Sequence, residues 1–208
     1  MTKKIDIDKI VKILKKETKK YPDPMGTLIS IERSPFKLLI STMLSARTRD
    51  TVTFPVVKKL FEEVKNPKDL ADMSIKDIEN HIKRLGLYPT KARNIKATAK
   101  IIHEKYHDKV PRQMEKLLEL PGVGRKTSNL VRSLSFKIPG ITVDTHVHRF
   151  SNQLGLVKTK TPEQTEKALM KILPKKYWII WNDLLVKWGQ NNSRKDIKEL
   201  FDNKNMLK

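Results

Sequence analysis

Residues 120–126 read Leu-Pro-Gly-Val-Gly-Arg-Lys and separate two segments whose apolar residues recur at helical spacing. The two glycines allow the backbone to turn tightly and to pass close to another surface. The helix predicted after them starts with unpaired N–H groups and the positive end of its dipole. We therefore expect Gly122, Val123 and Gly124 to present backbone amides to a phosphate, with an ordinary corner between two helices as the alternative.

Two ionisable side chains extend this prediction from binding to catalysis. Lys126 falls in the first turn of the predicted helix, where the positive helix end favours a neutral, nucleophilic amine. Asp144 is the predicted N-cap of a second helix, from Thr145 to about Leu154. If the two face each other across a cleft, Asp144 can accept a proton and stabilise positive charge opposite it. Taken singly, each residue favours a simpler interpretation, a solvated lysine and an aspartate that only caps its helix.

The remainder of the chain also has helical periodicity, and the alternation typical of strands is almost absent. Pro55 is expected to start or kink its helix, Gly189 to end another, and residues 193–196 to start a last one. Before that last helix, the predicted helices cover residues 6–18, 36–44, 51–65, 75–85, 91–106, 112–119, 125–135, 145–154, 162–173 and 177–188. About ten short helices joined by brief loops predict an all-α architecture.

The composition is that of a globular and strongly basic chain. Its 208 residues allow one or two domains, and 44 Lys and Arg against 23 Asp and Glu give a net charge of +21. This excess points first to a polyanionic partner, with the charge-rich surface of a heat-adapted protein as the alternative. The absence of cysteine excludes disulfides, a thiol nucleophile and cysteine-bound zinc. No signal peptide or membrane span is evident, so we expect a cytoplasmic, intracellular protein without a membrane partner.

Residues 120–129, followed by Val143-Asp-Thr-His146, closely resemble the helix–hairpin–helix and Gly/Pro…Asp motifs of endonuclease III-type DNA glycosylases, the HhH-GPD family. The separation between the lysine and the aspartate also fits that family. Upstream, residues 34–46 resemble its early core helix, and residues 85–95 resemble its first hairpin-like corner. The resemblance spans residues 30–155.

The resemblance implies a base-excision repair enzyme, a bifunctional DNA glycosylase with AP-lyase activity. It would act as a monomer on double-stranded DNA that contains damaged bases or abasic sites, and oxidised pyrimidines are the expected substrates. Relatives that remove mismatched thymine or uracil, adenine opposite oxidised guanine, or 8-oxoguanine itself share the scaffold. A non-catalytic DNA-binding module is a further alternative. The implied HhH-GPD fold has two helical subdomains with the active-site cleft between them. Residues 28–135 would form a six-helix subdomain with the hairpin, and residues 1–27 and 136–208 the other.

The resemblance also implies roles for individual residues. Lys126 would attack the sugar as the nucleophile, and Asp144 would assist it. Arg47, where the family often has glutamine, and Leu87 would fill the gap left by a flipped base, and His146 would lie near the lesion pocket. The expected DNA-binding residues are Gly122, Val123, Gly124, Arg125, Thr127, Arg47, Leu87 and His146.

Two further expectations concern metals. The family usually ends in a four-cysteine iron–sulfur loop that this chain lacks, so we expect the C-terminus to be held by packing of Trp178, Trp181, Leu185 and Trp188. His103-Glu-Lys-Tyr-His107 matches the H-E-x-x-H zinc pattern. Because the second histidine falls at a predicted helix end and no third ligand is evident, we expect neither a catalytic metal nor another cofactor.

Overall fold

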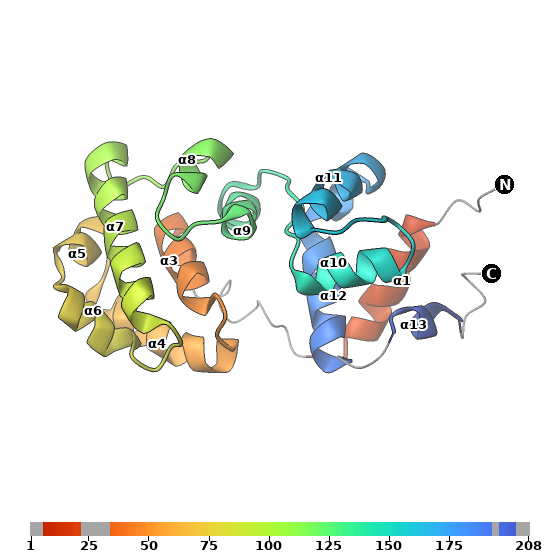
Figure 1. Ribbon diagram of the computed structural model, residues 1–208, viewed down its shortest axis with the longest axis horizontal. Coiled ribbons are helices and arrows are strands. Elements are labelled where there is room, and N and C mark those ends of the chain that lie inside the picture. The colour runs from red at the N-terminus through yellow and green to blue at the C-terminus, as the bar shows by residue number, and fades with distance from the viewer. Residues whose placement is uncertain (1–5, 22–33, 193–195, 203–208) are drawn as a thin grey trace. The chain divides into compact units, whose positions relative to one another are not determined.

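The computed structural model describes residues 6–21, 34–192 and 196–202, and within these ranges the chain forms helices and loops without β-strands (Figure 1). The predicted all-α class is therefore confirmed. The helices are α1 (Ile7–Thr18), α3 (Pro35–Ser45), α4 (Asp50–Glu63), α5 (Pro67–Asp72), α6 (Ile75–Ile82), α7 (Tyr88–Tyr106), α8 (Met114–Leu118), α9 (Arg125–Phe136), α10 (Thr145–Gln153), α11 (Pro162–Ile172), the 3₁₀ helix η1 (Lys175–Tyr177), α12 (Trp178–Asn191) and α13 (Lys198–Asp202). No helix among these residues combines the length and apolar character that a membrane span requires.

Contacts within the chain divide it into two compact units. The hairpin unit, Met25–Ile138, contains α3 to α9. The terminal unit combines Met1–Pro24 with Pro139–Lys208, so that α1 belongs with α10 to α13. The subdomain boundary expected between residues 27 and 28 lies outside the described residues.

The hairpin unit is built around the 19-residue helix α7, which packs against α3, α5 and α6. On the inner face of α7, Ile95, Ala99 and Ile102 are completely buried. Helix α3 joins the same core and also packs against α4 and α9. Because burial of each large aliphatic side chain contributes about 1.5–3 kcal/mol, this shared core fixes α9 relative to α3 and α7.

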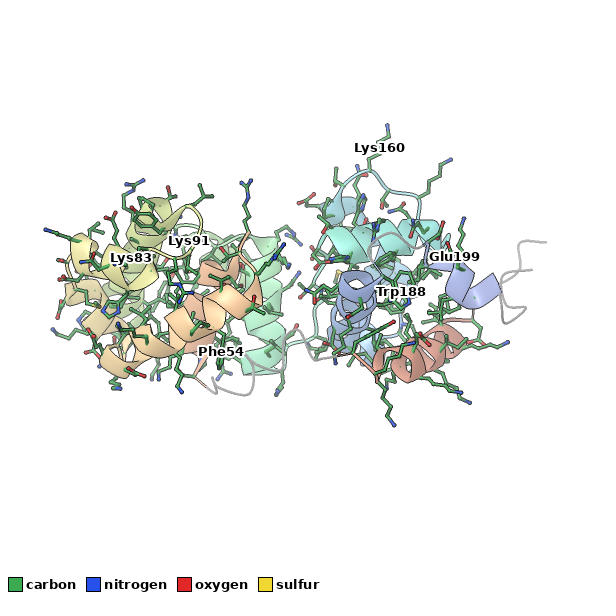
Figure 2. All side chains as sticks on the ribbon, turned by 90° about the horizontal axis from the view of Figure 1, so that it is seen from below. Phe54, Lys83, Lys91, Lys160, Trp188 and Glu199 are labelled. Atoms are coloured by element: carbon green, nitrogen blue, oxygen red, sulfur yellow. The ribbon has the colours of Figure 1, made fainter. Side chains whose placement is uncertain are left out.

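The terminal unit closes around α12, which packs against α1 and α10. The buried face of α12 carries the predicted residues Trp178, Trp181, Leu185 and Trp188, of which Trp188 is labelled in Figure 2. Ile197 and Phe201, from the C-terminal segment, are completely buried in the same cluster. The prediction that this face of α12 packs in the core is therefore confirmed, and the C-terminal segment packs in the same cluster.

Helix α4 departs from the prediction at its start. It begins at Asp50, one residue before the predicted range 51–65, so of the two expectations for Pro55, a start or a kink, the start is wrong. Pro55 removes one N–H donor from the helix interior, but the following Val56 and Val57 are buried in the hairpin-unit core. Tertiary burial thus offsets the cost of an internal proline.

Helix α12 departs from the prediction at its end. It continues through Gly189 to Asn191, so the expectation that Gly189 ends it is wrong. A Cβ at Gly189 would lie 2.6 Å from Phe150 Cε2 and 3.0 Å from His146 Cε1. The glycine therefore allows close packing of α10 on α12. The helix start predicted at residues 193–196 falls on positions of which 193–195 lie outside the described residues.

Candidate active site

The hairpin between α8 and α9 is fixed from within and from one side. The Val123 amide donates a hydrogen bond to the Leu120 carbonyl at 3.0 Å, which closes the turn. The Thr98 hydroxyl of α7 donates to the Pro121 carbonyl at 3.1 Å. The hairpin is therefore held against the long helix of its unit.

The two hairpin glycines are both exposed but are needed for different reasons. Gly122 has a φ of 77°, in the left-handed region, and a Cβ there would lie 2.7 Å from Asn94 Nδ2. Gly124, the N-cap of α9, has an extended backbone with φ −100° and ψ 178°, and a Cβ there would have no atom within 4 Å. Folding thus explains the glycine at 122 but not the one at 124. The open space beside Gly124 suits close approach of an external group.

Val123 does not fit the role expected of it. Its amide already donates to the Leu120 carbonyl, and its side chain is buried in the hairpin-unit core. The expected contact of this amide with a phosphate stays a prediction. Val123 shapes the hairpin from the inside.

The first turn of α9 carries Arg125, Lys126 and Thr127. Gly124 has no side chain that could cap this helix, and no acidic residue occupies its first turn. Lys126 is exposed, whereas Arg125 and Thr127 are partly buried. The structure thus places an exposed primary amine at the positive end of a helix, two residues after the open side of the hairpin.

Asp144 is the N-cap of α10, as predicted, because its Oδ1 accepts a hydrogen bond from the Val147 amide at 2.9 Å. This bond fixes the carboxylate at the positive end of α10. Two residues earlier, the Thr142 carbonyl accepts a hydrogen bond at 3.1 Å from the buried side-chain amide of Asn182 in α12. The segment that leads to Asp144 is therefore anchored to α12. Sequence reasoning missed Asn182. It could have been noticed as a polar residue within an apolar helix.

His146 lies in the first turn of the helix that Asp144 caps. Its ring stacks on Phe150, with centroids 5.9 Å apart and planes inclined by 23°. Phe150 in turn forms a T-shaped pair with Trp188, with ring centroids 5.0 Å apart and planes inclined by 85°. The terminal-unit core therefore orients the His146 ring.

Arg47 and Leu87 lie at two corners of the hairpin unit, and both have left-handed backbones, with φ of 58° and 60°. Arg47 is exposed in the loop after α3, and Leu87 is the N-cap of α7 with 58% of its surface exposed. A left-handed backbone costs an ordinary residue roughly 1–2 kcal/mol. The surrounding contacts must therefore hold both corners in place.

Lys91, which sequence reasoning missed, contacts both corners. Its Nζ donates to the Leu44 carbonyl at 2.7 Å and to Thr48 Oγ1 at 2.8 Å, and its backbone amide donates to the Leu87 carbonyl at 3.0 Å. Burial lowers the pKa of this ammonium from its ordinary value. The available signal was its position, since Lys91 lies one helical turn before Ile95 on the apolar stripe of α7.

The H-E-x-x-H pattern does not form the geometry that a zinc site needs. The His103 Nδ1 lies 2.9 Å from Asp108 Oδ1, and His107 is the C-cap of α7 with a left-handed φ of 49°. The two imidazoles therefore do not share a helical face. Over residues 6–21, 34–192 and 196–202, no group of three or more His, Cys, Asp or Glu side chains could hold a metal ion.

The starts of α9 and α10 lie in a part of the chain that matches a known protein family. Residues 40–175 match the model of the HhH-GPD superfamily of base excision DNA repair proteins. The chain belongs to this superfamily. It is 50% identical to endonuclease III of Thermotoga maritima over 159 residues, which cover 76% of this chain and 75% of that protein. It is 40% identical to endonuclease III of Bacillus subtilis over 161 residues, or 77% of this chain and 74% of that protein.

Two similar solved structures are DNA complexes. A non-covalent endonuclease III–DNA complex matches with a TM-score of 0.82 and 36% identity, covering 99% of this chain and 100% of that chain. A trapped endonuclease III–DNA covalent intermediate matches with a TM-score of 0.80 and 38% identity, covering 92% and 90%. The resemblance to the HhH-GPD family and the assignment of its fold are thereby confirmed.

A four-cysteine iron–sulfur cluster does not fit this HhH-GPD chain. Cysteine thiolates are the ligands of such clusters, and the chain contains no cysteine. In the C-terminal segment, Ile197 and Phe201 are instead buried against the tryptophan face of α12.

Proposed function

We propose that this protein is a bifunctional base-excision repair enzyme that removes oxidised pyrimidines from double-stranded DNA and then cleaves the strand as an AP lyase. Membership of the HhH-GPD superfamily and the endonuclease III relatives support the DNA glycosylase/AP-lyase class. The similarity to endonuclease III–DNA complexes supports DNA as the partner. The observation that carries the proposal is the exposed Lys126 in the first turn of α9, the helix whose N-cap is Gly124. A glycosylase that only activates water needs no amine there.

Lys126 is the proposed nucleophile. Its neutral Nζ attacks C1′ of the damaged nucleotide, and the bond from C1′ to the base breaks as the protonated base leaves with the electron pair. Protonation of O4′ opens the sugar ring, and the bond from C1′ to Nζ becomes a Schiff base. This imine withdraws electrons, so removal of a C2′ proton expels the 3′ phosphate and cuts the strand.

Asp144 is proposed to accept the proton that Lys126 must lose and to stabilise positive charge on the sugar. Its hydrogen bond from the Val147 amide supports this role, because it fixes the position of the carboxylate at the start of α10. In this proposal, the amine and the carboxylate act on the same deoxyribose.

The start of α9 is proposed to bind a DNA phosphate through backbone amides and polar side chains. The residues proposed for this contact are Gly122, Gly124, Arg125 and Thr127. The net charge of +21 supports electrostatic attraction to the duplex. Such contacts fix the position of the protein on DNA without reading sequence.

Three further residues are proposed to act at the lesion. Arg47 and Leu87 would occupy the gap left by the flipped nucleotide, since both are exposed at corners with left-handed backbones. His146 would lie beside the lesion pocket, in the helical turn after Asp144.

A panel of duplexes, each with one defined lesion, tests the proposed function through strand cleavage by the full chain. We expect cleavage at oxidised pyrimidines and abasic sites, and a loss of at least about 10³-fold in Lys126→Ala. Lys137→Ala is the matched control, because Lys137 is exposed at the opposite end of α9 and should leave cleavage unchanged. Cleavage only at mismatched bases or 8-oxoguanine would overturn the substrate class. DNA binding without any cleavage would overturn the enzymatic proposal.

A further inference from the structure

Lys91 is a buried charged residue that the proposed chemistry does not use. Only 8% of its surface is exposed, and it lies in the first turn of α7, in the hairpin unit (Figure 2). Burial of an ammonium group is costly unless hydrogen bonds compensate for the lost water. An apolar side chain would suit the buried face of α7 better, so the contacts of Lys91 should explain why a lysine lies there.

The side chain of Lys91 holds the loop that carries Arg47. Its Nζ donates to the carbonyl of Leu44, in the last turn of α3, where helix carbonyls lack partners within the helix. It also donates to Thr48 Oγ1, and the Thr48 amide donates to the Ser45 carbonyl at 3.0 Å. The ammonium therefore ties the end of α3 to the residue directly after Arg47.

The backbone of Lys91 holds the other corner. Its amide donates to the carbonyl of Leu87 at 3.0 Å, in the first hydrogen bond of α7. One residue is thus bonded to both segments that carry exposed side chains on strained, left-handed backbones. The directions of Arg47 and Leu87 depend on the contacts that hold those backbones.

We propose that Lys91 is a positioning residue that holds Arg47 and Leu87 as a pair, so that both side chains enter the same gap in the duplex. Lys91 itself does not touch DNA in this account, because its ammonium is occupied inside the protein. The inference rests on the proposed function, since only an enzyme that flips a nucleotide creates that gap. Displacement of a positioned group by about 1 Å can cost about 10²-fold in rate.

Lys91→Met tests this role, because methionine retains much of the length of lysine but has no donors. We expect single-turnover cleavage of an abasic duplex to slow about tenfold. Lys96→Met is the matched control, since Lys96 lies on the same helix and donates to the carbonyls of Ala71 and Met73, at the end of α5. We expect this control to change the rate by less than about twofold. The thermal unfolding temperature of each variant is measured to check that the chain remains folded.

The decisive comparison repeats Lys91→Met in a background that already carries Arg47→Ala and Leu87→Ala. If Lys91 acts through those residues, the substitution should now slow cleavage by less than about twofold. Equal slowing in both backgrounds, or slowing no greater than that of Lys96→Met, would overturn the inference.

Thr48→Val provides a second variant should Lys91→Met fail to fold. It removes one acceptor of the Lys91 ammonium at similar volume, and we expect a smaller slowing that also disappears in the double-alanine background. Persistence of that slowing in the background would overturn the inference. Absence of cleavage by the unmodified chain would instead overturn the proposed function, and this inference with it.

Discussion

The helix starts at Gly124 and Asp144 are built in opposite ways. Helix α9 begins at a glycine that cannot cap it, whereas the carboxylate of Asp144 caps α10 through the Val147 amide. The first arrangement leaves the positive helix end accessible to an external anion, and the second uses it to hold a carboxylate. The positive end of a helix can therefore serve either to bind a ligand or to fix a catalytic group. It also suggests substitutions that separate the two uses.

The largest effect is expected at the aspartate-capped start. Asp144→Asn keeps a good N-cap but removes the negative charge and the base. We expect the cleavage rate to fall about 100-fold or more, while the affinity for abasic DNA and the thermal unfolding temperature change little. Single-turnover cleavage and equilibrium DNA binding measure the two quantities separately.

Asp6→Asn is the matched control for this substitution. Asp6 caps α1 in the same way, since its Oδ1 accepts a hydrogen bond from the Lys9 amide at 3.0 Å. We expect unchanged cleavage in this variant. Equal losses of rate and affinity in Asp144→Asn would show that Asp144 is only a structural cap.

The next effect concerns the glycine that folding requires. Gly122→Ala places a Cβ on a left-handed backbone and against Asn94. We expect a loss of about 1–2 kcal/mol in the free energy of unfolding, measured by denaturant titration. An unchanged midpoint would contradict the packing that distinguishes Gly122 from Gly124.

The smallest effect on folding is expected at the glycine-capped start. Gly124→Val fits the extended backbone and the open space inside the protein, but its side chain would obstruct a phosphate. We expect DNA affinity to fall about tenfold for every sequence tested, with a loss of about 1 kcal/mol or less in stability. Unchanged affinity at constant salt would remove the proposed phosphate contact from this helix start.

The sequence predicts features that depend on neighbouring residues. The cap at Asp144 was predicted, and Ser74 and Thr161 cap their helices in the same way, since each of the three side chains accepts a hydrogen bond from the backbone three residues later. A cap of this kind involves residues within one helical turn, so it can be predicted from a short stretch of sequence. Helical periodicity likewise predicted the all-α class.

Features that depend on distant residues were missed or misassigned. The Lys91 ammonium reaches a carbonyl 47 positions away, and the Asn182 amide reaches one 40 positions away. Gly189 looked like a helix end because only the fold brings the aromatic ring of Phe150 against it. Local patterns do not contain these contacts.

The most direct test of the account identifies the lysine that reacts with DNA. The full chain is incubated with a duplex that contains one abasic site, the Schiff base is reduced with borohydride, and the DNA-bound peptide is mapped by mass spectrometry. We expect a single covalent link at Lys126, formed more slowly in Asp144→Asn. A link at another lysine, or strand cleavage without any trapped adduct, would contradict it.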